Sequence, residues 1–208
     1  MQAGESRNGD GRQVDRSTGD GMSNDAKPND TGPNEARPND VRPGRPEPTL
    51  QDVGIRIARD GTWYHAGTAF QRPALVKLFA SVLRRAEDGT YMLVTPVERG
   101  RVEVEDAPFV AVEMVVEGEG AGRTLRFRTN VDDWVTADAD HPIRVETAAG
   151  SDEPSPYVLV RKGLEARIQR AVFYDLVELA EEEDGMLVVR SAGAVFPLGP
   201  AVDIEEDA

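Results

Sequence analysis

The chain has 208 residues, a formal net charge of −14 and no cysteine, and 39% of its residues are hydrophobic. The absence of cysteine excludes disulfides, thiolate metal sites and a cysteine nucleophile, and it fits a cytoplasmic protein. The acidic charge disfavours nucleic acid and anionic membranes as partners, and no run of about 18 apolar residues is present that could span a bilayer. The sequence therefore predicts a cytoplasmic protein with no nucleic-acid or membrane partner.

Residues 1–48 form a degenerate five-residue repeat. An acidic residue falls at every fifth position from Glu5 to Asp40, and prolines follow the same period from Pro28 to Pro43. The units consist mainly of Gly, Asn, Asp, Arg and Pro, so burial of apolar groups cannot offset the entropy lost on ordering. We expect a disordered tail, which is either a partner-binding arm or a neutral repeat.

The folded part begins with two short strands and a helix. The run IRIAR and the residues Trp63–His65 have strand character and flank an Asp-Gly turn. Apolar residues then recur at spacings of three and four from Arg72 to Leu83, which predicts an amphipathic helix with Pro73 in its first turn. We expect Asp88-Gly89 to end this helix and the run TYMLV to form the next strand.

The middle of the chain is rich in strand patterns. RVEVED alternates between apolar and polar residues, APFVAVEMVVEG continues as an apolar strand, and TLRFRTN alternates again. GEGAG separates the last two runs and is typical of a flexible hairpin tip. It lacks the strand-to-helix context of a phosphate-binding loop.

The end of the chain repeats the order of elements found near its start. YVLVR and LEARI are expected strands on either side of a Lys-Gly turn, a helix is predicted over Arg170–Ala180, EEEDG ends it, and MLVVRS forms a strand. Aligning the two helices places Leu75 over Phe173 and Leu78 over Leu176, which predicts that these positions are buried in both. We interpret the two segments as a duplicated strand-turn-strand-helix-strand unit.

We therefore predict an α+β protein of two lobes related by duplication. The lobes are assigned to residues 49–112 and 113–203, and a short acidic end follows at 204–208. A duplicated unit normally packs against its copy and creates a groove between the two. Because ligands commonly bind in such grooves, the seam between the lobes is the predicted working surface.

Several of these segments resemble a bacterial family of uncharacterised proteins, the domain of unknown function 1285 (DUF1285). The resemblance covers residues 49–199, and the runs that carry it include WYHAGTAFQRPALVKLFASVLR, TNVDDWV, DHPIRVE and PYVLVRKGLEARIQRAVFYDLVEL. It implies an α+β core with duplicated motifs and a second half loosely like a pleckstrin-homology fold. It also implies a pocket between the domains for a nucleotide-like ligand, and a signalling role.

The most polar cluster of the folded part lies in TNVDDWVTADADHP. Its groups suit a metal site or a general base: Asp132, Asp133, Asp138, Asp140 and His141. Asp-rich loops are equally typical of turns and caps, and the glycine and glutamate of a calcium loop are missing. With two histidines and no G-x-S-x-G motif, a Ser-His-Asp triad is not indicated. We predict no catalytic residue and no metal ligand, and the sequence identifies no cofactor.

Arginines are informative because basic residues are scarce in this chain. They lie in a predicted turn (Arg99, Arg101), on one face of a predicted strand (Arg126, Arg128), and on strands near the second unit (Arg144, Arg161). If several converge, their guanidinium groups form a pocket for phosphate or carboxylate. The alternative is that they pair with glutamates across the sheet, which contributes little to stability.

Our preferred hypothesis is a non-enzymatic, signalling-related protein that holds a small anionic, nucleotide-like ligand at the seam. Arginines would hold the anion, Trp134 would pack against a flat group, and Asn130 and His141 would supply polar specificity. The predicted ligand-binding residues are Arg99, Arg126, Arg128, Asn130, Trp134, His141 and Arg144. The alternatives are an adaptor that binds a protein partner without a small ligand, and a metal-assisted enzyme that uses the Asp/His loop. The sequence identifies neither the ligand nor the oligomeric state.

Overall fold

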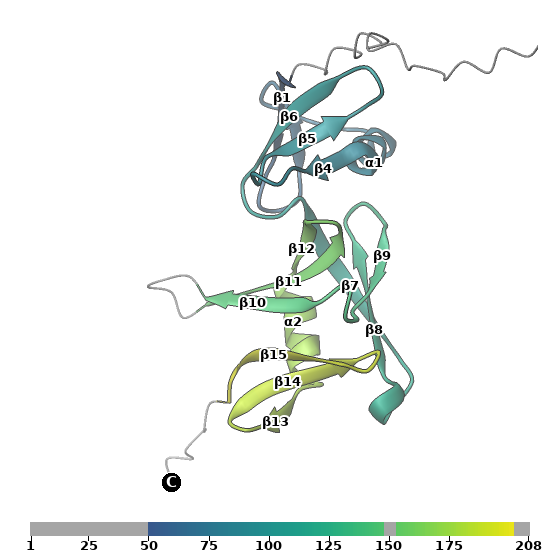
Figure 1. The fold of residues 1–208 in the computed structure, drawn as a ribbon, viewed down its shortest axis with the longest axis vertical. Coiled ribbons are helices and arrows are strands. Elements are labelled where there is room, and N and C mark those ends of the chain that lie inside the picture. The colour runs from purple at the N-terminus through teal and green to yellow at the C-terminus, as the bar shows by residue number, and fades with distance from the viewer. Residues whose placement is uncertain (1–49, 148–152, 202–208) are drawn as a thin grey trace, which may run out of the picture. The chain divides into compact units, whose positions relative to one another are not determined.

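The computed structural model describes residues 50–147 and 153–201, which form fifteen strands in three sheets and two α-helices (Figure 1). Strands dominate, and at this coarse level the α+β prediction is confirmed. The tail predicted over residues 1–48 and the acidic end at 204–208 lie outside the described residues. Neither helix of the described segments is long and apolar enough to cross a membrane.

The first sheet contains the first six strands. Their bounds are β1 (Leu50–Ile57), β2 (Trp63–His65), β3 (Thr68–Ala69), β4 (Leu83–Arg85), β5 (Tyr91–Val94) and β6 (Arg99–Val104), and their spatial order is β3-β2-β1-β6-β5-β4. The pairs are antiparallel except β1 with β6, which is parallel. Ile55 and Ile57 alternate with exposed or half-buried residues on β1 and enter the core, as a period of two requires.

Helix α1 (Pro73–Val82) packs against this sheet next to β5. Pro73 stands in its first turn, where the missing N–H group costs no hydrogen bond. The helix ends at Val82 because the backbone becomes extended at Leu83, whose side chain is fully buried. Within the helix, only Ala80 is fully enclosed.

The second sheet contains the next six strands. Their bounds are β7 (Phe109–Glu117), β8 (Thr124–Thr129), β9 (Trp134–Thr136), β10 (Ile143–Thr147), β11 (Pro154–Arg161) and β12 (Leu164–Ile168), and their spatial order is β10-β11-β12-β7-β8-β9. A 3₁₀ turn, Gly120–Gly122, lies between β7 and β8, which pair as an antiparallel hairpin, so the predicted hairpin tip is confirmed. On β8, Leu125, Phe127 and Thr129 are buried and the arginines face the other way, as the alternation predicted.

The chain ends with helix α2 (Arg170–Val177) and a third sheet of three antiparallel strands. These are β13 (Glu181–Glu183), β14 (Met186–Ser191) and β15 (Ala194–Pro200). The fully buried hydroxyl of Ser191 ties β14 to the second sheet. It donates to the Ala137 carbonyl at 2.6 Å and accepts from the Leu125 N–H at 2.8 Å.

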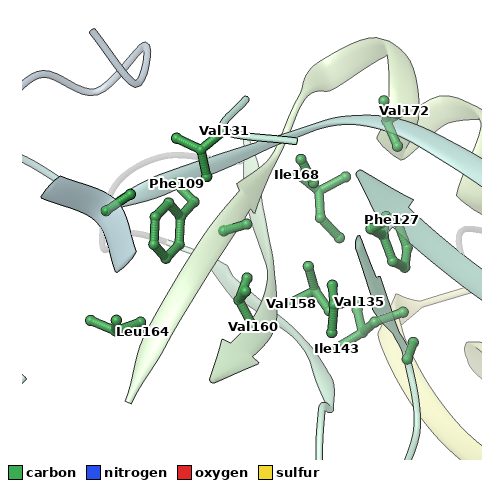
Figure 2. Packing of buried hydrophobic residues seen from close by; sticks show 14 of the residues in the cluster. Phe109, Phe127, Val131, Val135, Ile143, Val158, Val160, Leu164, Ile168 and Val172 are labelled. Atoms are coloured by element: carbon green, nitrogen blue, oxygen red, sulfur yellow. The ribbon is translucent and has the colours of Figure 1, made fainter. Parts of the chain in front are cut away.

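One continuous hydrophobic core includes side chains from both helices and from all three sheets. Figure 2 shows its central part, where Phe109, Phe127, Val158 and Ile168 gather from β7, β8, β11 and β12. Each of these four side chains is at most 2% exposed. Burying a side chain of this size contributes about 1.5–3 kcal/mol.

Both predicted helices extended too far, for the same physical reason. Arg84 and Arg85 lie on β4, and residues 181–183 form β13, so each helix is followed by a short strand. The Asp-Gly pairs that were expected to end the helices are hairpin turns, in which Gly89 and Gly185 have φ angles of 85° and 75°. An Asp-Gly hairpin turn requires a strand on each side.

One further prediction, that Arg99 and Arg101 lie in a turn, needs correction. Arg99 and Arg101 lie on β6, and the turn before it is closed by a bond from the Thr95 N–H to the Glu98 carbonyl, at 3.0 Å. The predicted lobe boundary after residue 112 falls inside β7, which runs without interruption from Phe109 to Glu117.

Candidate functional site

A cavity of about 670 Å³ lies between helix α1 and the second sheet, and we call it the seam cavity. From the first half of the chain it is lined by α1 and the start of β4, and from the second half by the loop after β8 and the turn between β11 and β12. The lining residues are Lys77, Ala80, Ser81, Leu83, Arg84, Val131, Asp132, Asp133, Arg161, Lys162 and Leu164. Four cationic and two anionic side chains therefore surround this cavity in a protein that is acidic as a whole.

Arg161 is held rigidly at the cavity wall. Its guanidinium donates to Asp133 Oδ2 and to the Ala80 carbonyl, both at 2.7 Å, and lies 5.0 Å from the centroid of the Phe109 ring. Ala80 belongs to the last turn of α1, where a cation is favoured by the helix dipole. The β11–β12 turn is thereby joined to the C-terminal end of α1.

Asp132 joins the opposite side of the cavity to the same helix. Its carboxylate accepts from Lys77 Nζ at 2.5 Å and from Arg128 at 2.9 Å. These two bonds, first that from Lys77 and then that from Arg128, lower the pKa of the Asp132 carboxyl. The residue has a φ of 62°, a left-handed conformation that is uncommon outside glycine and tolerated best by Asp and Asn. This conformation places one carboxylate between two cations.

Arg84 and Lys162 are the two cations of the cavity that form no ion pair among the described residues. Arg84 donates to two carbonyl groups, those of Ser81 and Leu83, at 2.9 and 2.6 Å. Within residues 50–147 and 153–201, neither Arg84 nor Lys162 forms an ion pair, and both side chains are exposed. The cavity thus combines two cations that are ion-paired, Lys77 and Arg161, with two that are not.

Asn130, one of the predicted ligand residues, has a structural role beside the cavity. Its Oδ1 accepts from the Val110 N–H and its Nδ2 donates to the Gly61 carbonyl, both at 3.1 Å. Gly61 has a φ of 83°, and a Cβ added there would lie 2.5 Å from Asn130 Nδ2. Asn130 therefore links the β1–β2 turn to β7, and glycine is required at the contact.

The predicted arginines on β8 pair with glutamates on the neighbouring strand. Arg126 contacts Glu117 at 2.9 Å and Arg128 contacts Glu113 at 2.6 Å. The Arg126 guanidinium also lies 5.2 Å from the Trp134 ring on β9. For these two arginines the geometry matches the cross-strand alternative rather than an anion pocket.

The other predicted residues lie elsewhere. Arg144 is on β10, separated from β8 by three strands of the same sheet, and donates to both carboxylate oxygens of Glu165, at 2.5 and 2.7 Å. Arg99 is on β6 of the first sheet. His141 Nδ1 lies 2.9 Å from Asp138 Oδ1. None of the seven predicted residues lines the seam cavity, although Arg128 reaches Asp132 at its edge.

The Asp/His loop forms a turn in the structure. Asp138 Oδ1 accepts from the backbone N–H groups of Asp140 and His141, at 2.9 and 2.8 Å. Nowhere in the described part of the chain do three His, Asp or Glu side chains come together in an arrangement that could hold a metal ion.

The sequence did not single out the cations that line the cavity. Lys77 falls within the predicted amphipathic helix and Lys162 in the predicted Lys-Gly turn, and neither was among the predicted ligand-binding residues. Charged residues at such positions are usually solvated, and no local pattern indicates which of them meet across a seam. Arg161 was recognised as a strand arginine, but its bond to the α1 carbonyl spans 81 residues of sequence.

A larger cavity, of about 830 Å³, lies along β1, β5 and β6 of the first sheet. Its charged lining consists of Asp52, Arg56, Asp88, Arg101 and Glu103, so acids outnumber bases. For an anion, the seam cavity is the more favourable of the two.

Family models match almost all of the described chain. Residues 44–107 match the model described as "Domain of unknown function (DUF1285), N-terminal domain", and residues 108–198 match "Protein of unknown function (DUF1285), C-terminal domain". The chain belongs to the DUF1285 family. Its family boundary falls between residues 107 and 108, immediately before β7, and the predicted resemblance is confirmed. The family descriptions assign no activity.

Two solved structures of DUF1285 proteins are similar to this chain. One, from Silicibacter pomeroyi DSS-3, is 48% identical and has a TM-score of 0.70, over 74% of this chain and 84% of its own. The other, from Shewanella baltica OS155, is 29% identical and has a TM-score of 0.48, over 61% of this chain and 91% of its own. No curated protein matches the chain.

Proposed function

We propose that this DUF1285 protein binds a small phosphate- or carboxylate-bearing ligand in the seam cavity. The observation that supports the proposal is the pair of exposed cations, Arg84 and Lys162, beside the fixed cations Lys77 and Arg161. A guanidinium and an ammonium group are the side chains that best pair with phosphate or carboxylate oxygens. The predicted anionic ligand at the seam is retained, with a different set of residues.

The cavity offers more to the charged part of a nucleotide-like ligand than to its base. Among the residues that the structure describes, no Trp, Tyr, Phe or His lines it, and Trp134 lies on β9. The proposal therefore concerns the anion, and the nucleotide is one member of a wider class.

Ligand binding could serve signalling by changing the contacts between α1 and the second half of the chain. An anion near Lys77 competes with Asp132 for the same ammonium group, and an anion near Arg84 contacts the end of α1. A ligand shifts a conformational equilibrium only if it binds the two states differently. Because both halves of the chain line the cavity, a bound anion stabilises the arrangement in which α1 and the β11–β12 turn are close.

The test is isothermal titration of the full 208-residue chain with pyrophosphate, citrate and ATP. Lys162→Gln and Arg84→Gln remove the two cations that form no ion pair among the described residues, without burying a charge, and each is expected to weaken binding by roughly tenfold. Arg101→Gln is the matched control, because it removes an arginine from the outer face of the first sheet. Equal affinities for all four proteins, or no saturable binding to the unaltered chain, would contradict the proposal.

We also propose that the two similar segments arose by duplication. The elements β1-β2-α1-β4-β5-β6 and β11-β12-α2-β13-β14-β15 follow the same order, apart from the two-residue β3. In each, the helix is followed by three antiparallel strands. Superposition of the two segments on their helices tests the duplication, and we expect the three strands after each helix to follow the same path.

We also propose that the second half resembles a pleckstrin-homology fold, and this proposal rests on the family resemblance alone.

A further inference from the structure

A second cavity, of about 390 Å³, lies between α1 and the first sheet, and we call it the helix cavity. Its interior is apolar, and it shares no lining residue with the seam cavity. The apolar side chains include Val53 and Ile55 from β1, Phe79 and Val82 from α1, and Leu93 from β5. Its volume falls within the range of about 300–1,000 Å³ that is typical of small-molecule sites.

The irregular start of β1 shapes this cavity. The pairing of β1 with β6 shifts register between Asp52 and Ile55, and Gly54 between them has a φ of 62°. Opposite this shift, Gly100 on β6 leaves room for Val53, because a Cβ added to Gly100 would lie 2.5 Å from Val53 Cγ1. The local backbone therefore places an apolar hollow beneath α1.

Three aromatic rings and one carboxylate also line the cavity. The His65 and Phe70 rings have centroids 6.3 Å apart, and Phe70 and Phe79 have centroids 5.6 Å apart. Glu98 lines the cavity from the β5–β6 turn, where its N–H bonds Thr95 Oγ1 at 3.0 Å. Glu98 is exposed, and its carboxylate has no ion-pair partner in the part of the chain that the structure describes.

We propose that the helix cavity binds a small organic cation, an ammonium group that carries an apolar substituent. The substituent fills the apolar interior, while the ammonium group lies against the aromatic rings and Glu98. Ring faces attract cations, and this effect is the usual basis of substituted-ammonium recognition. The net charge of −14 further favours a cation over an anion at this protein surface.

The neighbouring charges are consistent with this choice. Arg99 follows Glu98 in sequence, but it alternates with Gly100 on β6, so its side chain leaves the strand on the face opposite to the cavity. Within the described part of the chain, no lysine or arginine lines the cavity. Of these described lining residues, Glu98 is the one carboxylate, and His65 is the other titratable group.

The test compares three probes that each contain an unbranched six-carbon chain, on the full 208-residue chain by titration calorimetry: hexyltrimethylammonium, hexanol and hexanoate. We expect the cation to bind more tightly than the alcohol, and the alcohol more tightly than the carboxylate. Glu98→Gln should weaken binding of the cation by roughly threefold to tenfold and leave binding of hexanol unchanged. Glu103→Gln, which removes an exposed carboxylate from β6, the strand that follows Glu98, is the matched control.

A cavity-filling variant, Val82→Phe, distinguishes binding of the probes inside the helix cavity from binding elsewhere on the protein surface. It should abolish binding of both hexyltrimethylammonium and hexanol, while pyrophosphate binding at the seam cavity is retained and shows that the variant is folded. If pyrophosphate does not bind the unaltered chain, an unchanged circular dichroism spectrum replaces that control. No saturable binding of the cation, equal binding of cation and alcohol, or an unaffected Val82→Phe variant would each overturn the proposal.

Discussion

Two regions of the chain each consist of a helix followed by three antiparallel strands. They share this order of elements but differ in the sheet to which the three strands belong. In the first region, α1 is followed by β4, β5 and β6. Because β6 pairs in parallel with β1, these three strands form one sheet with β1, β2 and β3. In the second, α2 is followed by β13, β14 and β15, which form a sheet of their own. Local sequence determines the order of elements, whereas the sheet that a meander joins depends on long-range contacts.

The two helices show the same contrast in burial. The sequence alignment pairs Leu78 of α1 with Leu176 of α2, but Leu176 is 0% exposed and Leu78 is 60% exposed. The prediction that Leu78 is buried was therefore wrong. Because the core encloses so little of α1, its remaining surface is available to line both the seam cavity and the helix cavity. The helix that contributes least to the core thus contributes to both proposed sites.

The largest expected effect comes from truncating the aligned leucines. Leu176→Ala should lower the free energy of unfolding by about 2–5 kcal/mol, because it leaves a cavity in a closed core. Leu78→Ala should change it by less than about 0.5 kcal/mol, because the side chain is already mostly in water. Urea denaturation of the two variants measures the difference. Similar losses in both would show that α1 is as firmly packed as α2.

A smaller effect is expected where the third sheet is tied to the second. Ser191→Ala leaves the buried Leu125 N–H and the Ala137 carbonyl without the hydroxyl, and should cost about 1–3 kcal/mol of unfolding free energy. Ser81→Ala, which removes an exposed hydroxyl from α1, is the control and should be nearly neutral. Hydrogen exchange should show faster exchange of the β14 amides in Ser191→Ala. Unchanged exchange would mean that other contacts, such as the bond from the Ala192 N–H to the Arg123 carbonyl at 2.8 Å, anchor this sheet without the Ser191 hydroxyl.

The sequence predicts regular elements well where a single period dominates. The alternation in TLRFRT matches the buried and half-buried residues of β8, and both amphipathic helices exist. The helix ends were missed because β4 and β13 are only three residues long, too short for a period to be recognised. The Asp-Gly pairs carried the missing signal, since they are hairpin turns rather than helix ends.

The candidate site was less predictable, because its contacts are not local. The pairing of Lys77 with Asp132 spans 55 residues, and no local sequence pattern indicates that these two residues meet. Conversely, Arg126 and Arg128 satisfied a local pattern, a shared strand face, and the structure uses them in cross-strand ion pairs. Position on a strand indicates which face a residue occupies but not what approaches that face.

The smallest expected effect is the pH dependence contributed by Asp132, which contacts Lys77 of α1. The folded pKa of Asp132 is lowered from its ordinary value of 3.8, so its carboxylate stabilises the folded state above that pH, and this contribution is lost as pH falls through the folded pKa. Asp132→Asn keeps a residue that tolerates the left-handed backbone and removes the charge. The thermal midpoint of the unaltered chain should therefore exceed that of the variant near neutral pH.

That difference should shrink as the pH is lowered below about 4, because Asp132 is then protonated first in the unfolded chain and, at still lower pH, in the folded chain as well. Asp140→Asn, which removes an exposed carboxyl without an ion pair among the described residues, serves as the control and should show no such trend. A midpoint difference that is zero near neutral pH would mean that the Lys77–Asp132–Arg128 contact does not hold α1 in solution. The fixed half of the seam cavity would then have to be assigned to Arg161 alone.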